Sequence, residues 1–141
     1  MKGRIYLNIK KLTIRQIIEL KNAKKIIFES NCHSNNDEIS DIIESILLYF
    51  PIKNIYAEVD NLEKFTIIDG NNFLDGIFDF IDNKFELCDM EFFTEFNGKK
   101  FSELPWHIRS RILETELIIY GINVNEEINI KHSFKRRIKE A

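Results

Sequence analysis

The apolar residues of this 141-residue chain change their spacing several times along the sequence. Residues 39–47 place isoleucines on one face of a helix, whereas residues 54–59 and 64–69 form apolar or alternating runs that predict two strands joined by a turn at Asn61. Helical spacing returns from Asn72 onward. Because helical and strand segments interleave, we predict an α+β fold with a small mixed sheet, and not a helix bundle or a β-sandwich.

Further strands and helices are predicted on both sides of this central part. Strands are expected at residues 4–9, 26–28 and 115–122, with two short strands within residues 85–96. Other helices are expected over residues 14–21, 105–112 and 126–139. Thr13 with Gln16 forms a capping-box pattern, and Asn36 or Asp37 can cap the helix that contains residues 39–47. Pro51 is expected to end that helix, and Pro105 to begin a later one.

The composition and the lack of internal divisions predict a single domain over residues 1–141. The chain has 25 isoleucines and 12 phenylalanines but only 5 glycines and 2 prolines, which favours packed helices and strands over long loops. No repeat, low-complexity tract or linker divides it. We therefore expect the isoleucine and phenylalanine side chains to form one core and not a cofactor site.

The net charge of −3 is distributed unevenly along the chain. Residues 1–25 carry eight Lys or Arg and one Glu, and residues 131–141 carry five Lys or Arg and one Glu, so the large excess of acidic residues lies between these two ends. Basic ends suit a phosphate-bearing partner such as nucleic acid. The simpler interpretation is a set of solvated charged surfaces, because the whole chain is acidic.

Cysteine and histidine positions do not predict a metal site. Cys32 and Cys88 lie far apart and His33, His107 and His132 are scattered, so no zinc-binding spacing is present and free thiols are expected. The basic N-terminus lacks the apolar run of a signal peptide, and no segment has the ~18 consecutive apolar residues of a membrane span. We therefore expect a cytoplasmic protein with no membrane partner.

One strand-to-helix junction is a candidate anion-binding site. The sequence Asp69-Gly70-Asn71-Asn72 follows a predicted strand and precedes a predicted helix, where backbone N–H groups can contact an anion. The alternative is a turn and helix cap without a ligand.

Other patterns have simpler interpretations, and no catalytic residue is assigned from them. Cys32 and His33 are adjacent in an extended segment, so their side chains point apart. Asp79 with Asp82, and Asp89 with Glu91, are pairs of the kind expected by chance among 23 acidic residues. A lone tryptophan such as Trp106 usually anchors packing.

A series of motifs occurs around this junction in a recognisable order. They are the helix motif IIESIL at residues 42–47, the step Pro51-Ile52, and the junction IDGNNFL at residues 68–74. This order and spacing resemble the N-terminal domain of GmrSD-type restriction endonucleases. The later segments FSELP and ELIIYGI, together with Phe134-Lys135-Arg136, extend the resemblance to residues 12–138.

The resemblance implies a fold like that of ParB and sulfiredoxin, and nucleotide hydrolysis at the family's D-G-Q-Q-R loop. It also implies a nucleotide, with Mg²⁺, as cofactor and a role in restriction of modified phage DNA. The resembled enzymes pair this domain with a nuclease half that has a histidine-centred metal site. Since 141 residues are too few for both halves, we do not expect this chain to cleave DNA.

The chain departs from the family at the residues that would bind phosphate. Asn71 and Asn72 replace two glutamines, and Phe73 replaces an arginine whose guanidinium could bind phosphate in a bidentate way. A second family motif, tyrosine-glutamine-arginine, falls on residues 28–30, where Glu29 and a serine replace the glutamine and the arginine. Of the family's motif cations, only Arg136 remains.

Three hypotheses follow for the function. The first is a degenerate, non-catalytic relative of the GmrSD N-terminal domain, which acts as a binding or regulatory module in phage defence or a phage-encoded setting, with a nuclease or other defence protein as partner. The second is a nucleotide-binding NTPase that uses Asp69, Gly70, Asn71 and Asn72, with Arg136 as its cation. The third is an acidic module that mimics the charge of nucleic acid and binds a basic protein.

Overall fold

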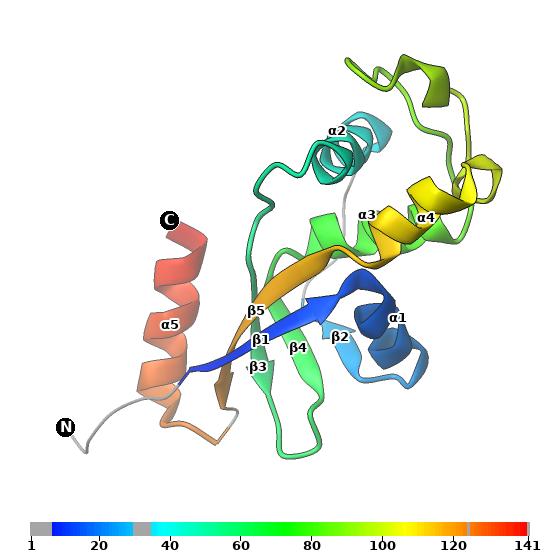
Figure 1. Ribbon diagram of the computed structural model, residues 1–141. Coiled ribbons are helices and arrows are strands. Elements are labelled where there is room, and N and C mark those ends of the chain that lie inside the picture. Colours follow the sequence, from blue (N-terminus) through cyan, green and yellow to red (C-terminus); the bar gives the residue numbers. More distant parts are fainter. Residues whose placement is uncertain (1–6, 30–34, 124, 141) are drawn as a thin grey trace.

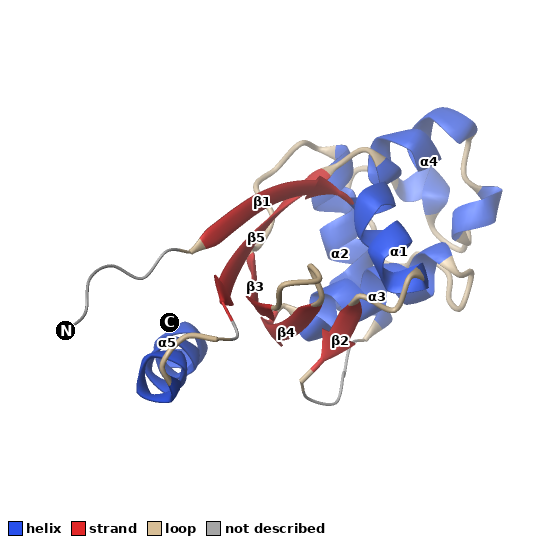
Figure 2. Ribbon diagram, turned by 90° about the horizontal axis from the view of Figure 1, so that it is seen from below, coloured by secondary structure: helices blue, strands red, loops and turns tan. Residues whose placement is uncertain are grey.

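Five strands form one mixed sheet with helices on both of its faces (Figures 1 and 2). The computed structural model describes residues 7–29, 35–123 and 125–140. In sheet order the strands are β1 (Asn8–Thr13), β5 (Glu116–Asn123), β3 (Ile55–Val59), β4 (Phe65–Asp69) and β2 (Ile26–Phe28). The predicted α+β class with a small mixed sheet is therefore confirmed.

The strand order combines a local hairpin with pairings between distant segments. Strands β3 and β4 form an antiparallel hairpin, with a register shift at Tyr56, and β2 adds to β4 in parallel. Strand β5 lies between β3 and β1, parallel to β3 and antiparallel to β1. The chain's early and late segments thus meet on the β1 side of the sheet.

The helices separate into two groups about this sheet, as Figure 2 shows most directly. One face carries α1 (Ile14–Asn22), α2 (Asn36–Leu47), α3 (Asn71–Ile81) and α4 (Trp106–Leu113), whereas α5 (Ile128–Glu140) lies on the opposite, outer face. Isoleucine and phenylalanine form most of the core, as predicted. Fully buried examples from the four helices and the sheet are Ile14, Ile43, Phe80, Ile112 and Ile119.

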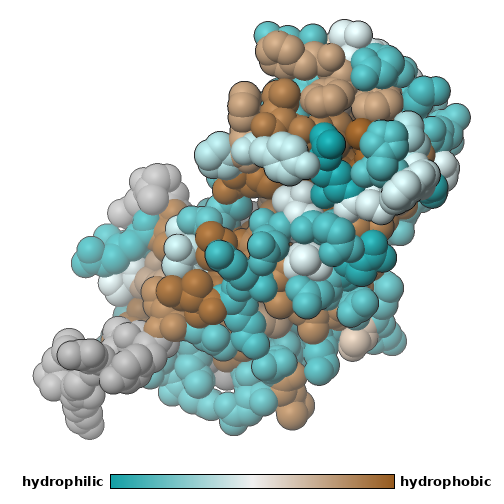
Figure 3. All heavy atoms as spheres, in the orientation of Figure 1, coloured by the Kyte–Doolittle hydropathy of each residue, from teal (hydrophilic) through white to brown (hydrophobic). Residues whose placement is uncertain are grey.

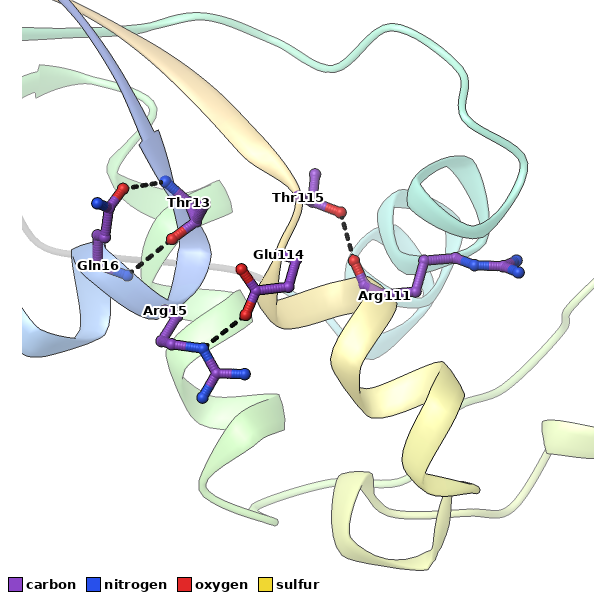
Figure 4. Close-up of polar contacts among 6 residues, drawn as sticks. All are labelled: Thr13, Arg15, Gln16, Arg111, Glu114 and Thr115. Carbon is purple, nitrogen blue, oxygen red and sulfur yellow. Dashed lines mark hydrogen bonds and ion pairs between the residues drawn. The ribbon is translucent and has the colours of Figure 1, made fainter.

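The turn from β1 into α1 lies beside the turn from α4 into β5 (Figure 4). Thr13 Oγ1 accepts from the N–H of Gln16 at 3.1 Å, and the Thr13 N–H donates to Gln16 Oε1 at 2.9 Å, which is the predicted capping box. Arg15 pairs with Glu114 at 2.6 Å across the two turns. The Arg15–Glu114 pair therefore links the start of α1 to the residue that follows α4.

The two short strands predicted within residues 85–96 are absent, so that prediction is wrong. The segment after α3 forms an irregular loop with two short 3-10 turns, Thr94–Phe96 and Phe101–Glu103. Its backbone is held by Glu44 of α2, whose carboxylate accepts from the N–H groups of Glu91, Phe92 and Phe93 at 2.8, 2.8 and 2.9 Å. A side chain thus takes the place of a neighbouring strand.

Several element boundaries differ from the predictions. Strand β1 begins at Asn8 and continues to Thr13, because it pairs with β5 along that whole length, and residues 1–6 lie outside the described part. Asn35, not Asn36 or Asp37, caps α2. The same helix ends at Leu47, ahead of Pro51, since Tyr49 takes a left-handed φ of 60°.

None of the helices formed by the described residues is both long and apolar enough to cross a bilayer.

Candidate functional site

The Asp69-Gly70-Asn71-Asn72 junction lies where β4 ends and α3 begins. Gly70 is the N-cap of α3 with a φ of +100°, and α3 has no side-chain cap at this end. A Cβ at this position would come within 3.2 Å of Ile55 Cγ1, so both the backbone conformation and the space favour glycine. Asp69 therefore ends the strand but is not the helix cap.

The four junction residues differ in accessibility. Asp69, Gly70 and Asn71 are half-buried and Asn72 is exposed. Phe73, the next residue, is only 6% exposed and belongs to the core, as predicted. The position at which the resembled family has a phosphate-binding arginine is thus an apolar packing position in this chain.

The polar contact that the structure builds near the predicted site centres on Lys135 of α5. Its Nζ atom lies 2.8 Å from Glu58 Oε1 and 3.2 Å from Glu29 Oε2. Glu58 belongs to β3, and Glu29 follows β2 and donates its backbone N–H to Ile67 of β4. Lys135 therefore joins α5 to β3 and to the residue that follows β2.

The electrostatics of this contact favour the charged lysine. The hydrogen bond to Glu58 raises the pKa of Lys135, burial opposes that rise, and the bond to Glu29 adds to it. The Tyr56 ring stacks on Tyr120 at 5.4 Å and meets Phe134 edge-on at 6.4 Å, so aromatic packing also joins α5 to β3. The positive charge is thus matched by two carboxylates of the same chain.

The segments that hold the predicted site residues are neighbours in the fold. Helix α5, which carries Arg136, contacts β4, the strand that ends at Asp69. Arg136 itself is exposed on α5. Arg136 was predicted from the sequence as a site residue, whereas the pairing of Lys135 with Glu29 was not. The sequence did hold one signal of this pair. Glu29 lies at the second motif of the resembled family and Lys135 at the third, and the two residues carry opposite charges.

The remaining candidates have structural partners or lie outside the described residues. Asp79 pairs with Lys84 and Asp82 pairs with Lys21, each at 3.4 Å, so these two acids do not form a cation site together. Trp106 is 72% exposed, and its predicted role as a packing anchor is wrong, because its ring contacts only the edge of the His107 ring among the described aromatic groups. Cys32 and His33 are outside the described residues.

A small polar cluster forms around Cys88. Its thiol donates to Asp37 Oδ1 at 3.2 Å, and Asp89 lies close enough for the three side chains to share one ion. Burial raises the pKa of Cys88, and the hydrogen bond to Asp37 raises it further. The thiol is therefore held protonated, a form that neither attacks a substrate nor ligates a metal well.

Three cavities formed by the described residues are lined by side chains other than the predicted site residues. Their volumes are about 290, 380 and 520 Å³. The first lies beneath α1, the second lies between the start of β1 and α5, and the third lies beside Cys88. Comparison with protein-family models, with curated proteins and with solved structures finds no match to this chain.

Proposed function

We propose that this domain is a non-catalytic binding or regulatory module, related to the N-terminal domain of GmrSD-type restriction endonucleases and of ParB-like fold. Its setting would be phage defence or a phage genome, and its partner a nuclease or another defence protein. The proposal combines the motif order of the sequence with a small mixed sheet carrying interleaved helices. The observation that carries the non-catalytic part is the Lys135 contact.

The Lys135 contact supports the proposal through charge. Catalysis on a triphosphate needs cations that can turn toward the phosphates. Lys135 is instead held by Glu29 and Glu58, and Glu29 stands where the resembled family has a neutral glutamine. Buried Phe73 removes a second cation. The positions of Glu29 and Phe73 therefore offer an incoming phosphate no cation.

The first test measures nucleotide turnover. Purified protein is incubated with ATP or GTP and Mg²⁺, and phosphate release is followed over many equivalents of enzyme. We expect no turnover above buffer. Multiple turnovers that Asp69→Ala abolishes would refute the proposal and favour the NTPase hypothesis.

The second test restores the family's neutral side chain by Glu29→Gln. The variant keeps the size of the side chain but removes one of the two charges that hold Lys135. The matched control is Glu63→Gln, which removes a carboxylate that pairs with Lys10 elsewhere. Thermal shift with nucleotide and Mg²⁺ measures binding, because ligand at 100 times its Kd stabilises by about 2.7 kcal/mol. We expect any shift to be larger for Glu29→Gln than for the wild type or Glu63→Gln, and an equal shift in all three would contradict the argument.

A further inference from the structure

Strand β1 is an open edge of the sheet. Among the described strands it pairs with β5 alone, so the backbone groups on its other side have no strand partner. Leu7, just before this strand, and Ile9, its second residue, are 42% and 60% exposed. An edge strand with exposed apolar side chains is a template for pairing with another extended chain.

Cavities open on both faces of this edge. Side chains alternate along a strand, so Leu7 and Ile9 face one side of the sheet and Lys10 and Leu12 face the other. Leu7 lines the cavity of about 380 Å³ with Ile122 and Phe134, and Figure 3 shows apolar side chains gathered in this region, between α5 and the start of β1. Lys10 and Leu12 line the cavity of about 290 Å³ together with Leu20 and Phe65.

The charge on this edge is positive on its outer face. Lys11 is exposed on β1, and Arg137 of α5 is exposed at the cavity beside Leu7, where its Nε donates to Ser133 Oγ at 3.1 Å. The lining of that cavity includes no acidic side chain among the described residues. The basic N-terminal and C-terminal parts of the chain, far apart in sequence, thus meet here.

We propose that β1 is a docking edge for an extended segment of a partner protein, in which apolar residues alternate with acidic ones. The segment adds as a sixth strand, with main-chain hydrogen bonds to β1, its apolar side chains directed to the cavity lined by Leu12 and its acidic side chains to the opposite face. Its carboxylates meet Lys11 and Arg137. A second copy of the chain suits the edge less well, because two β1 strands would bring Lys10 and Lys11 against their own counterparts. This proposal goes beyond the proposed function and does not depend on whether nucleotide is hydrolysed.

The test uses a short fluorescein-labelled peptide in which valine alternates with glutamate, and a comparison peptide with lysine in place of glutamate. Fluorescence anisotropy measures binding to the full chain. We expect the glutamate peptide to bind at least about tenfold more tightly than the lysine peptide, and Lys11→Glu to weaken it by about tenfold. The matched control Lys100→Glu reverses the charge of an exposed lysine beside the Cys88 cavity and should leave affinity unchanged.

Strand addition is tested separately from charge. Methylation of alternate backbone nitrogens of the peptide removes its donors on one edge only, so one of the two methylated peptides should bind and the other should not. Hydrogen exchange should show that the unmodified peptide protects amides of Asn8–Thr13. Equal behaviour of the two methylated peptides, or no protection of β1, would overturn the proposal. So would a dimer of the chain in which the amides of Asn8–Thr13 are protected from exchange, or tighter binding of oligothymidine at the same residues.

Discussion

Glu44 is expected to be the main polar support of the loop that follows α3. The side chain is 4% exposed and its two carboxylate oxygens accept three backbone N–H groups at 2.8 to 2.9 Å. In Glu44→Gln, the amide oxygen can still serve two of these donors, but the NH₂ group faces the third donor. Because hydrogen bonds to a charged group contribute about 1.5–3 kcal/mol and an unpaired donor adds a penalty, the free energy of unfolding should fall by about 2–3 kcal/mol. Glu44→Ala leaves all three donors without the acceptor and should cost about 3–5 kcal/mol.

The pH dependence provides a second measure of the same contact. Burial raises the pKa of Glu44, but the bonds to Glu91, Phe93 and Phe92 together outweigh it and hold the pKa below its ordinary value. A carboxylate whose pKa is lower in the folded state stabilises the fold fully above its unfolded pKa, about 4.3. That contribution is lost as the pH falls through the lower, folded pKa. The wild type should therefore lose stability on acidification, and Glu44→Gln should lose less.

Urea denaturation of the wild type and the Glu44 variants, at neutral pH and at several acidic values, measures both effects. The matched control is Glu114→Gln, whose carboxylate forms an exposed ion pair with Arg15 and should cost less than about 1 kcal/mol. Hydrogen exchange at Glu91, Phe92 and Phe93 localises the effect. A Glu44→Gln variant as stable as Glu114→Gln would show that water replaces the carboxylate without loss and would refute the reasoning.

Three further predictions concern stability and are checked by chemical denaturation. Phe73→Ala should cost about 3–5 kcal/mol, because the ring is buried in the core, whereas an exposed binding residue would tolerate the change. Gly121→Ala should cost at least about 1–3 kcal/mol, since a Cβ there would overlap Val59 Cγ2 in the adjacent strand; a neutral effect would mean that β3 and β5 can separate locally. Thr13→Ala should cost about 1 kcal/mol through loss of the capping box, and Thr13→Ser should recover most of it.

The elements predicted correctly from the sequence are those determined by local patterns. Helices α2 and α3 have apolar residues at helical spacing, and the β3–β4 hairpin has two apolar runs separated by a short turn. The capping box at Thr13 is equally local. In each case neighbouring residues contain the information, because the periodicity follows directly from the geometry of the element.

The failures concern segments whose conformation depends on residues far away in sequence. Residues 85–96 contain an apolar pattern similar to that of a strand, but the N–H groups of Glu91, Phe92 and Phe93 meet Glu44 and not a neighbouring strand. The Lys135–Glu29 pair joins residues that only the folded sheet brings together. The change from strand to helix spacing predicted the Asp69-Gly70 junction, but the pairing of Lys135 with Glu29 and Glu58 depends on contacts between segments distant in sequence.

The position of β5 in the sheet determines when the fold can be completed as the chain is made. Strand β5 lies between β1 and β3, so β1 stays without its partner until Glu116–Asn123 has been synthesised. Pairing across this separation closes a long loop, which slows folding relative to the local β3–β4 hairpin. We therefore expect the hairpin with α3 to form early and β1 to join last, so the edge proposed to bind a partner is also the final part of the sheet to assemble.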